Sequence, residues 1–334
     1  MTTIAFFELE EWEKRYVSRK LRGNDLRFID GHLDEKNLAQ AADAEILSVF
    51  IYSKIGEKEL ASLPNVKLIA TRSTGYDHVD VKACASRGIV VCNVPAYGSE
   101  TVAEHTMALI LALAKKLVPS IEKTRRGDFT LDGLRTFDLE KKVLGIVGLG
   151  KIGAHTAKMA RSFGMKVVAY SPHTKEDEAK KLRCKLVSLD ELLAKSDVIS
   201  LHAPLTPETK HMINAETIAK MKQGVILVNT ARGGLVDAKA LVAALDSGKI
   251  AAAGLDVLEE ECNIREERQI LSPQFAGECD LKTVLAAHML LNKQNVIVTP
   301  HNAFNSTEAL QRILDTTVEN IKAFEKGQPQ NVVK

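Results

Sequence analysis

The chain has 334 residues, of which 45% are hydrophobic and 26% are charged, as is ordinary for a soluble globular enzyme of about two domains. Its net charge of +2, with Lys and Arg interspersed among acids, argues against a nucleic-acid partner. The acidic N-terminal stretch and the lack of an apolar run long enough to span a bilayer predict a cytoplasmic protein with no membrane segment.

The five cysteines make an odd total and include no CxxC pair. This pattern favours a reducing compartment and gives no indication of a disulfide framework or of a zinc site. We therefore expect no metal in the functional site.

Short apolar runs alternate with amphipathic, helix-prone segments over residues 1–95. Because strands that alternate with helices usually pair in parallel, with the helices on the faces of the sheet, this pattern predicts a parallel sheet. The predicted strands are IAFFEL, LRFID, AEILSVFI, KLIATRS and IVVCNV.

A long amphipathic helix is expected from about Ser99 to Arg126. Its apolar residues cover more than one face, which is typical of a helix buried between domains or at a subunit contact. We therefore expect a homodimer that forms through the helix from Ser99. His105 lies within this helix and is interpreted as a hydrogen-bonded structural histidine.

A glycine-rich turn between a strand and a helix lies in the middle of the chain. The run VLGIVGLGKIGAHTAKMA places Gly148, Gly150 and Gly153 in the order strand, G-x-G-x-x-G, helix. In such a turn the first glycine permits the bend, the second lets the backbone approach a pyrophosphate, and the third lets the helix pack closely on the strand. Taken alone, the pattern also fits an ordinary glycine-rich turn before a helix.

A second series of strands, apolar enough to be buried on both faces, favours the dinucleotide interpretation. Helices between these strands carry capping signals at Ser188 to Glu191, at Asn214 and at Asp237. A polar, helix-prone excursion then follows Leu258, and one long amphipathic helix ends the chain. The predicted strands, which together form a doubly wound sheet, are KVLGIVG, MKVVAYS, DVISLHA, GVILVNTA, AAAGLDV and NVIVTP.

The carboxyl ends of these strands are where ligands collect in an open parallel sheet. A nicotinamide enzyme that acts on an oxo acid needs a fixed cation for the carboxylate, an acid of near-neutral pKa for the carbonyl oxygen, and a carboxylate that orients that acid. Residue type alone leaves each candidate open to a structural interpretation, such as a surface ion pair or a solvated acidic run. The strand ends carry Ser171, His202, Arg232, Asp256, Glu259 to Glu261, and His301.

These stretches resemble the D-isomer-specific 2-hydroxyacid dehydrogenases over essentially the full length, and within that family they are most similar to the D-lactate dehydrogenases. The family's motifs appear in the same order and spacing as TRSTGYDHVD, VPAYGSETVAEH, VGLGKIG, NTARGGLVD, GLDVLEEE and TPHNAF. The resemblance implies an α/β fold of two doubly wound parallel-sheet domains with an active-site cleft between them. A flavodoxin-like substrate domain would comprise residues 1–99 and 300–334, and a Rossmann cofactor domain residues 100–299.

The resemblance also implies roles for individual residues. Arg232, Glu261 and His301 would be catalytic, and the family's spacing from the DV motif selects Glu261 among three adjacent acids. The backbone amides of Thr74 and Gly75, with Arg232, would hold the substrate carboxylate. The pocket would be shaped by Tyr97 and Phe304. The cofactor would contact Gly148, Gly150, Lys151, Ile152, Gly153, Ser171, Ala203, Pro204, Thr209, Thr230, Ala231 and Asp256.

The chain departs from the family at the end of the second strand of the cofactor domain. NAD-specific members usually carry an acid there, which binds the ribose 2′-OH and would repel a 2′-phosphate. This chain has Ser171, with Thr174 and Lys175 close by, and these side chains are able to accept a phosphate. NAD is the expected cofactor, with the use of NADP, or of both, left open.

The sequence therefore predicts a reversible NAD(P)-dependent reductase of a small 2-oxo acid, with pyruvate and D-lactate as the favoured pair. A glyoxylate or hydroxypyruvate reductase is the alternative within the family. An alternative of another class is a dinucleotide-sensing interaction protein, because the family also contains transcriptional corepressors.

Overall fold

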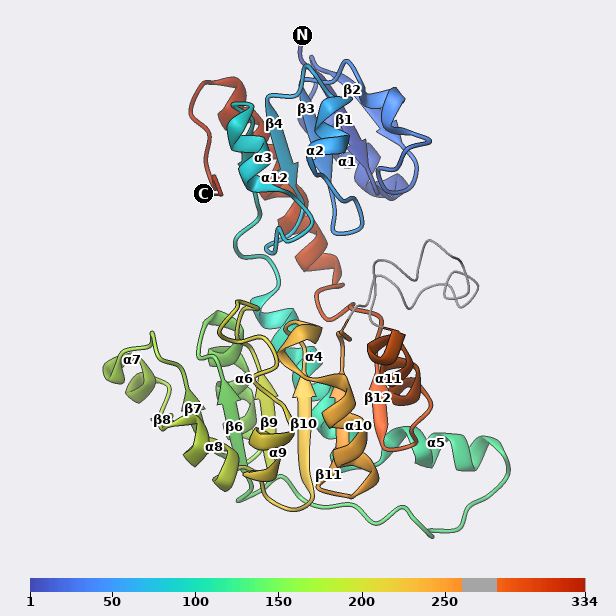
Figure 1. Ribbon diagram of the computed structural model, residues 1–334, viewed down its shortest axis with the longest axis vertical. Coiled ribbons are helices and arrows are strands. Elements are labelled where there is room, and N and C mark those ends of the chain that lie inside the picture. Colours follow the sequence, from blue (N-terminus) through green and yellow to red (C-terminus); the bar gives the residue numbers. More distant parts are fainter. Residues whose placement is uncertain (260–280, 334) are drawn as a thin grey trace. The chain divides into compact units, whose positions relative to one another are not determined.

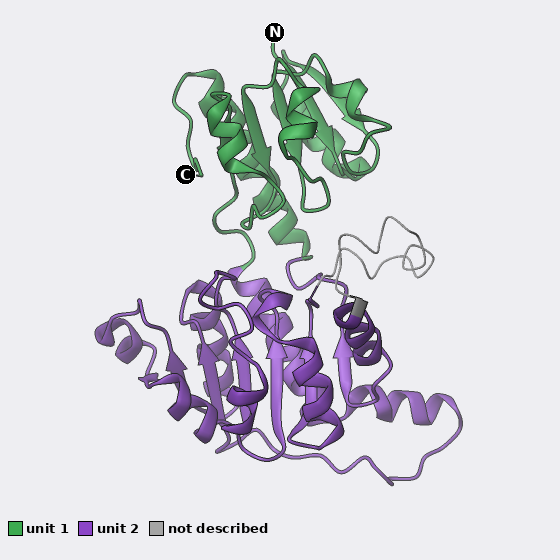
Figure 2. Ribbon diagram, viewed as in Figure 1, with its two compact units in different colours: residues 1–98, 305–334 green, residues 99–304 purple. Residues whose placement is uncertain are grey.

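The computed structural model describes residues 1–259 and 281–333, which fall into two compact units (Figures 1 and 2). Unit 1 comprises Met1–Gly98 and Asn305–Lys334, and unit 2 comprises Ser99–Phe304. The family resemblance placed the second division between residues 299 and 300, whereas the turn at 300–304 is part of unit 2. Within the described residues, no helix is long and apolar enough to cross a membrane.

Unit 1 is built on a parallel sheet of five strands with the order β2-β1-β3-β4-β5. This is the flavodoxin-like order, in which the chain changes direction between β1 and β3. All five strands predicted for this part of the chain are confirmed. Their bounds are β1 (Thr3–Phe7), β2 (Asp25–Ile29), β3 (Ile46–Val49), β4 (Leu68–Thr71) and β5 (Val90–Cys92).

Helices cover both faces of this sheet. On one face α1 (Glu11–Lys20) packs beside α12 (Thr307–Glu325), so the last helix of the chain joins a sheet built from its first residues (Figure 1). Buried Leu314, Val318 and Ile321 of α12, spaced at about one helical turn, supply its contribution to that core. The other face is covered by η1 (Leu38–Ala41), α2 (Glu57–Ala61) and α3 (Val81–Ser86).

Unit 2 contains a parallel sheet of seven strands with the order β12-β11-β10-β9-β6-β7-β8. The six predicted strands are confirmed, and the structure adds β8, which at two residues is too short to show a sequence pattern. The chain changes direction between the neighbouring strands β6 and β9. The bounds are β6 (Val143–Val147), β7 (Lys166–Tyr170), β8 (Lys185–Leu186), β9 (Val198–Leu201), β10 (Val225–Asn229), β11 (Ile250–Leu255) and β12 (Val296–Val298).

A hydrophobic core lies on each face of this sheet. On one face lie α4 (Ser99–Ala114), α6 (Lys151–Ser162) and α7 (Glu176–Lys181). The opposite core gathers η2 (Gly233–Leu235), α8 (Leu189–Lys195), α9 (Ala215–Ala219), α10 (Ala238–Asp246) and α11 (Leu281–Leu291). This sandwich of helix, sheet and helix is the doubly wound arrangement that the sequence predicted.

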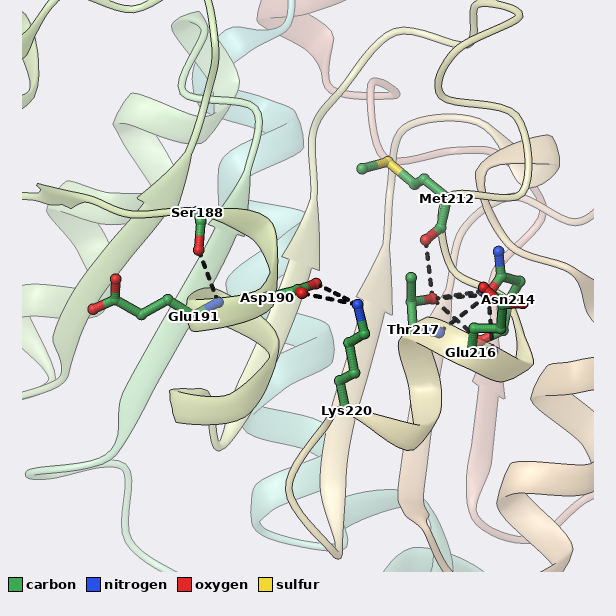
Figure 3. Close-up of polar contacts among 8 residues, drawn as sticks. All are labelled: Ser188, Asp190, Glu191, Met212, Asn214, Glu216, Thr217 and Lys220. Atoms are coloured by element: carbon green, nitrogen blue, oxygen red, sulfur yellow. Dashed lines mark hydrogen bonds and ion pairs between the residues drawn. The ribbon is translucent and has the colours of Figure 1, made fainter.

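The predicted helix caps are present in the structure. Ser188 Oγ accepts the amide of Glu191 at 3.2 Å, and Asn214 Oδ1 accepts the amides of Glu216 and Thr217 at 3.0 and 3.1 Å (Figure 3). Asp237 caps α10 in the same way. These side chains bind N–H groups that have no partner inside their own helix, and so fix where each helix begins.

The long helix predicted from Ser99 to Arg126 is wrong as a single element. It divides into α4, which ends at Ala114, and α5 (Leu117–Arg125), with Lys116 between them at a φ of +48°. Pro119 explains the break, because a continuous helix would bring its ring against the carbonyl of Lys115. In the first turn of α5 the missing N–H of Pro119 costs nothing.

Candidate functional site

The glycine turn follows β6, one of the two neighbouring strands, β6 and β9, between which the strand order of unit 2 reverses. Gly148 has a φ of +96°, and a Cβ on it would lie 2.7 Å from the backbone of His202, at the end of β9. A Cβ on Gly153 would lie 2.2 Å from the carbonyl oxygen of Gly148. The first and third glycines are therefore required by the close packing of the turn, as the motif predicts.

Gly150 differs from these two glycines because a Cβ on it would meet no atom within 4 Å. It is the N-cap of α6 and provides no side-chain cap, and the first turn of α6 carries no acid. The first N–H groups of this twelve-residue helix therefore have no side-chain cap at the positive end of its dipole, and the space beside Gly150 is open. This arrangement suits a pyrophosphate and thus the phosphate part of a dinucleotide.

Other predicted cofactor residues lie at the same edge of the sheet. Ser171 follows β7, and its hydroxyl shares a 2.8 Å hydrogen bond with Thr174 Oγ1. Past β9, Thr209 Oγ1 donates to the carbonyl of Pro204 at 2.6 Å, which closes the loop that follows Ala203. The loops that follow β7 and β9 therefore flank the glycine turn, which follows β6.

His202 was one of two strand-end histidines that the sequence offered. Its Nε2 shares a 2.9 Å hydrogen bond with Ser200 Oγ, and desolvation of the ring lowers its pKa to about 4. A histidine that stays neutral near pH 7 is poorly suited to donate a proton. His301 is therefore the candidate acid.

Arg232 lies on a turn that follows β10 and is shaped by the buried side chain of Asn229. Asn229 Oδ1 accepts the amide of Ala231 at 3.0 Å, and its Nδ2 donates to the carbonyl of Arg232 at 2.9 Å. Thr230, which lies between Asn229 and Ala231, shares a 2.8 Å hydrogen bond with Thr106 of α4. The backbone that carries the Arg232 guanidinium is thus held from two sides.

His301 lies on a turn that follows β12 and is held by Asp256, which follows β11 and is 1% exposed. The carbonyl of Asp256 accepts the amide of His301 at 2.9 Å. Its Oδ1 accepts the amide of Asn302 at 3.0 Å, and its Oδ2 that of Ala303 at 2.9 Å. His301 has a φ of +52°, a conformation that non-glycine residues rarely adopt, and these bonds stabilise it.

The predicted catalytic carboxylate, Glu261, lies outside the described residues. The acid two positions before it, Glu259, is described and is hydrogen-bonded through Oε1 to His211 Nε2. A Cβ on Gly233, next to Arg232, would lie 2.0 Å from the carbonyl oxygen of Leu258. The turn after β10 and the segment after β11 therefore lie against each other.

In unit 1, Thr74 and Gly75 follow β4 at the carboxyl edge of that sheet. The hydroxyl of Thr74 donates to the carbonyl of Val94 at 2.7 Å, and its carbonyl accepts from Asn93 Nδ2 at 2.8 Å. Among the described residues, the amides of Thr74 and Gly75 donate to no acceptor. Two neighbouring N–H groups without a partner are a feature of anion sites, which agrees with the predicted role in carboxylate binding.

Arg72, two residues before Thr74, fixes the start of the loop that follows β4 and was not identified from the sequence. Its guanidinium is buried and donates to the carbonyls of Phe7 and Glu8 at 2.6 and 2.8 Å, and to Ser48 Oγ at 3.1 Å. It thereby joins the ends of β1, β3 and β4. The remaining predicted residue of unit 1, Tyr97, accepts a hydrogen bond from Arg312 Nε on its carbonyl at 2.6 Å.

The structure thus places predicted residues at two strand edges, one in each unit. Arg232, Asp256 and His301 follow the adjacent strands β10, β11 and β12, and Phe304 ends the same turn as His301. Sequence reasoning missed the residues that support them, namely Asn229, Arg72 and Thr299, whose hydroxyl donates to Asp256 Oδ1. Asn229 had a signal, because an Asn directly at a strand end often shapes the following turn through its side chain.

Comparison with known proteins identifies the family. The model of the NAD-binding domain of D-isomer specific 2-hydroxyacid dehydrogenases matches residues 107–303. The chain belongs to this family. Since its members are oxidoreductases that act on the CH–OH group, the protein is an NAD-binding 2-hydroxyacid dehydrogenase.

Relatives of this dehydrogenase include proteins with different substrates in their names. The D-lactate dehydrogenase of Escherichia coli is 35% identical over 97% of each chain. The glycerate dehydrogenase of Methylorubrum extorquens is 42% identical over 82% of this chain and 81% of its own. A crystal structure of Aquifex aeolicus D-lactate dehydrogenase with NAD and lactic acid superposes with a TM-score of 0.85, at 40% identity over 97% of this chain and 96% of the other.

NAD is accordingly the cofactor of this dehydrogenase, and the glycine turn fits it. The space beside Gly150 and the uncapped start of α6 would suit its pyrophosphate. Among the described residues, no group of three or more His, Cys, Asp and Glu side chains is arranged to hold a metal ion.

Proposed function

We propose that this dehydrogenase interconverts pyruvate and D-lactate with NAD as the cofactor. The observation that carries the reaction type is that Arg232, Asp256 and His301 follow three adjacent strands, β10 to β12, of the sheet that also carries the glycine turn after β6. The choice of substrate is supported by the D-lactate dehydrogenases, since the similarity to them extends over nearly the whole of both chains.

Arg232 would bind the substrate carboxylate through its planar, permanently charged guanidinium and polarise the adjacent carbonyl. The amides of Thr74 and Gly75, which have no acceptor among the described residues, would bind the same carboxylate. Tyr97 and Phe304 would limit the size of the substrate side chain. These contacts select a 2-oxo acid with a small substituent, as pyruvate is.

His301 would donate a proton to the carbonyl oxygen during reduction and accept it during oxidation. Glu261 would keep the imidazole protonated, because a nearby negative charge favours its charged form. The bound cofactor supplies or accepts the hydride. The turn that Asp256 holds would keep the His301 ring in one position while the proton moves.

On the cofactor side, we propose that the pyrophosphate binds at the amides that follow Gly148. The adenosine ribose would lie by Ser171 at the end of β7, and the nicotinamide by Thr230 and Asp256 at the ends of β10 and β11. Ser171 offers a hydroxyl where an acid would exclude NADP, so we expect NADPH to be accepted as well. The other contacts would come from Gly150, Lys151, Ile152, Gly153, Ala203, Pro204, Thr209 and Ala231.

We further propose that the protein is a cytoplasmic homodimer. The helix from Ser99 is largely buried within its own unit as α4, so the exposed apolar surface lies instead on α5 and the segment after it. In that segment Phe129 is 78% and Leu131 is 83% exposed, next to half-exposed Leu117, Val118 and Ile121. An apolar stretch of this kind suits contact with a second copy of the chain.

A hydroxypyruvate or glyoxylate reductase is the second candidate, favoured by the 42% identity to a glycerate dehydrogenase. Initial rates of NADH and NADPH oxidation with pyruvate, glyoxylate, hydroxypyruvate and phenylpyruvate separate the two. We expect the highest kcat/KM with pyruvate and D-lactate as the product. A higher value with hydroxypyruvate or glyoxylate would support the second candidate instead.

The proposed chemistry depends on His301, and His301→Ala tests it. The variant should bind NADH with the wild-type Kd and lose at least a hundredfold in kcat, which is the low end of what general acid catalysis contributes. Turnover near that of the wild type would exclude the proposed acid.

A further inference from the structure

A chain of polar side chains runs from α4 to the turn that carries His301. His105 Nε2 lies 3.0 Å from Thr299 Oγ1 and 3.6 Å from Asp256 Oδ1. Thr299 Oγ1 is in turn hydrogen-bonded to the same Asp256 oxygen. Asp256 accepts the backbone amides of residues 301, 302 and 303, so the chain ends on the backbone of His301 and its neighbours.

The donor and acceptor capacities of these side chains determine which atom donates in each hydrogen bond. Asp256 is an acceptor for the two amides of Asn302 and Ala303, and as a carboxylate it has no proton to give. The single hydroxyl proton of Thr299 is therefore donated to Asp256, which leaves the Thr299 oxygen as an acceptor. His105 must then carry a proton on Nε2 and donate it to Thr299.

The helix that carries His105 is packed tightly against the same strands. Leu109, one turn further along α4, would lie 3.1 Å from a Cβ on Gly254, so this glycine lets the helix approach β11 closely. Thr106 hydrogen-bonds Thr230 in the turn that carries Arg232. Consecutive residues of α4 thus contact the turns of both Arg232 and His301.

We propose that His105 is a positioning residue for His301 and acts through Thr299 and Asp256. The role rests on the proposed function, in which His301 is the acid. The Nε2–H group of His105 fixes the Thr299 hydroxyl on Asp256, and Asp256 so oriented holds the left-handed backbone of His301. Without that donor the Thr299 hydroxyl is no longer held on Oδ1 of Asp256, and the turn that Oδ1 holds through the Asn302 amide loosens. The His301 ring then loses its fixed position, while Oδ2 keeps its bond from Ala303.

The consequence is a loss of turnover with little effect on binding. A displacement of about 1 Å at a reacting group costs on the order of a hundredfold in rate. Since one distant hydrogen bond is removed and the strands remain, we expect His105→Leu to lower kcat about tenfold. The KM for pyruvate and the Kd for NADH should stay within about twofold of the wild type, because the glycine turn is untouched.

The matched variant is His105→Gln, in which the Gln amide places an N–H near the position of the imidazole Nε2. We expect His105→Gln to recover kcat to within about threefold of the wild type, measured at a temperature where both variants are folded by circular dichroism. A purely structural role would show equal loss in both variants. Equal loss, or a kcat for His105→Leu within twofold of the wild type, would overturn the proposal.

Thr299→Val tests the same series of hydrogen bonds from the other side, and the single variant does not depend on whether His105→Leu folds. It keeps the shape of Thr299 and removes its hydroxyl, so kcat should fall by a similar factor. In the double variant, replacing His105 by Leu should cost no more, because the connection is already broken. Multiplication of the two losses would overturn the proposal.

Failure of the proposed function gives a different result. If His301→Ala turns over normally, the proposed acid is wrong whatever His105 does. If His301→Ala is inactive while His105→Leu has the wild-type kcat, the proposed function stands and only the positioning role falls.

Discussion

Gly150→Ala should weaken NADH binding without destabilising the protein. The backbone at Gly150 has φ −76° and ψ −164°, which alanine adopts freely, and the added Cβ would touch no protein atom within 4 Å. Alanine is a slightly poorer N-cap than glycine, but it lowers the entropy of the unfolded chain by a comparable amount. The free energy of unfolding should therefore change by no more than about 0.5 kcal/mol.

The same Cβ would occupy the space through which a pyrophosphate approaches the start of α6. If one charge-assisted hydrogen bond is lost, at about 1.5–3 kcal/mol, the Kd for NADH rises roughly 10- to 150-fold. Gly56→Ala is the matched control, since Gly56 is also an extended N-cap and lies in unit 1. Titration of NADH fluorescence measures both variants. A Kd for Gly150→Ala within twofold of that of Gly56→Ala would refute the placement of the pyrophosphate.

Three further predictions concern pH, cofactor choice and assembly. The pKa of His202 falls from 6.5 to about 4 on folding, so the unfolded chain binds the extra proton between these values and stability declines as the pH falls. Urea unfolding should show that the wild type loses about 3 kcal/mol more than His202→Gln between pH 7 and pH 4, and parallel losses would contradict this. Ser171→Asp should raise the ratio of kcat/KM for NADH to that for NADPH at least tenfold, and an unchanged ratio would place the ribose elsewhere. Leu131→Glu combined with Ile121→Glu should convert a dimer to a monomer in sedimentation equilibrium; a monomeric wild type would rule out the proposed contact.

The strands were predictable because their signal is local. A strand buried on both faces of a parallel sheet must be apolar along its length, and the runs DVISLHA and GVILVNTA, which form the fully buried β9 and β10, satisfy this without reference to the rest of the chain. β8 was not predicted, because only two of its residues, Lys185 and Leu186, pair with β7 and so short a strand has no apolar run. Pro119 is a local signal for the break before α5. The prediction of one continuous helix instead followed the apolar pattern, which continues across the break.

The site was predictable to the level of which residues lie at the strand ends. Parallel strands bring their carboxyl ends to one edge, so residue type and position along the chain were enough to make Arg232 and His301 candidates. The contacts that hold them were not predictable. His105 and Thr299 are 194 positions apart, and each is an ordinary polar residue in its own segment.

Domain boundaries depend on the same kind of distant contact. The family resemblance assigned residues from 300 onward to the substrate domain. The amides of Asn302 and Ala303 instead bind Asp256, 46 and 47 positions earlier, and this keeps the His301 turn with β11 and β12. Because no local pattern marks that attachment, the predicted boundary falls a few residues before that of the compact unit.

Asp256 illustrates why resemblance and structure give complementary descriptions of one residue. The resemblance suggests a cofactor contact, whereas the structure gives its carboxylate three partners: Thr299 and Asn302 on Oδ1, and Ala303 on Oδ2. A carboxylate offers about four acceptor positions, so within the described residues one position on Oδ2 remains for a donor such as a carboxamide N–H. The two roles are therefore compatible. A substitution of Asp256 would disturb both together, and only a change at His105 or Thr299 separates the positioning of His301 from the binding of the cofactor.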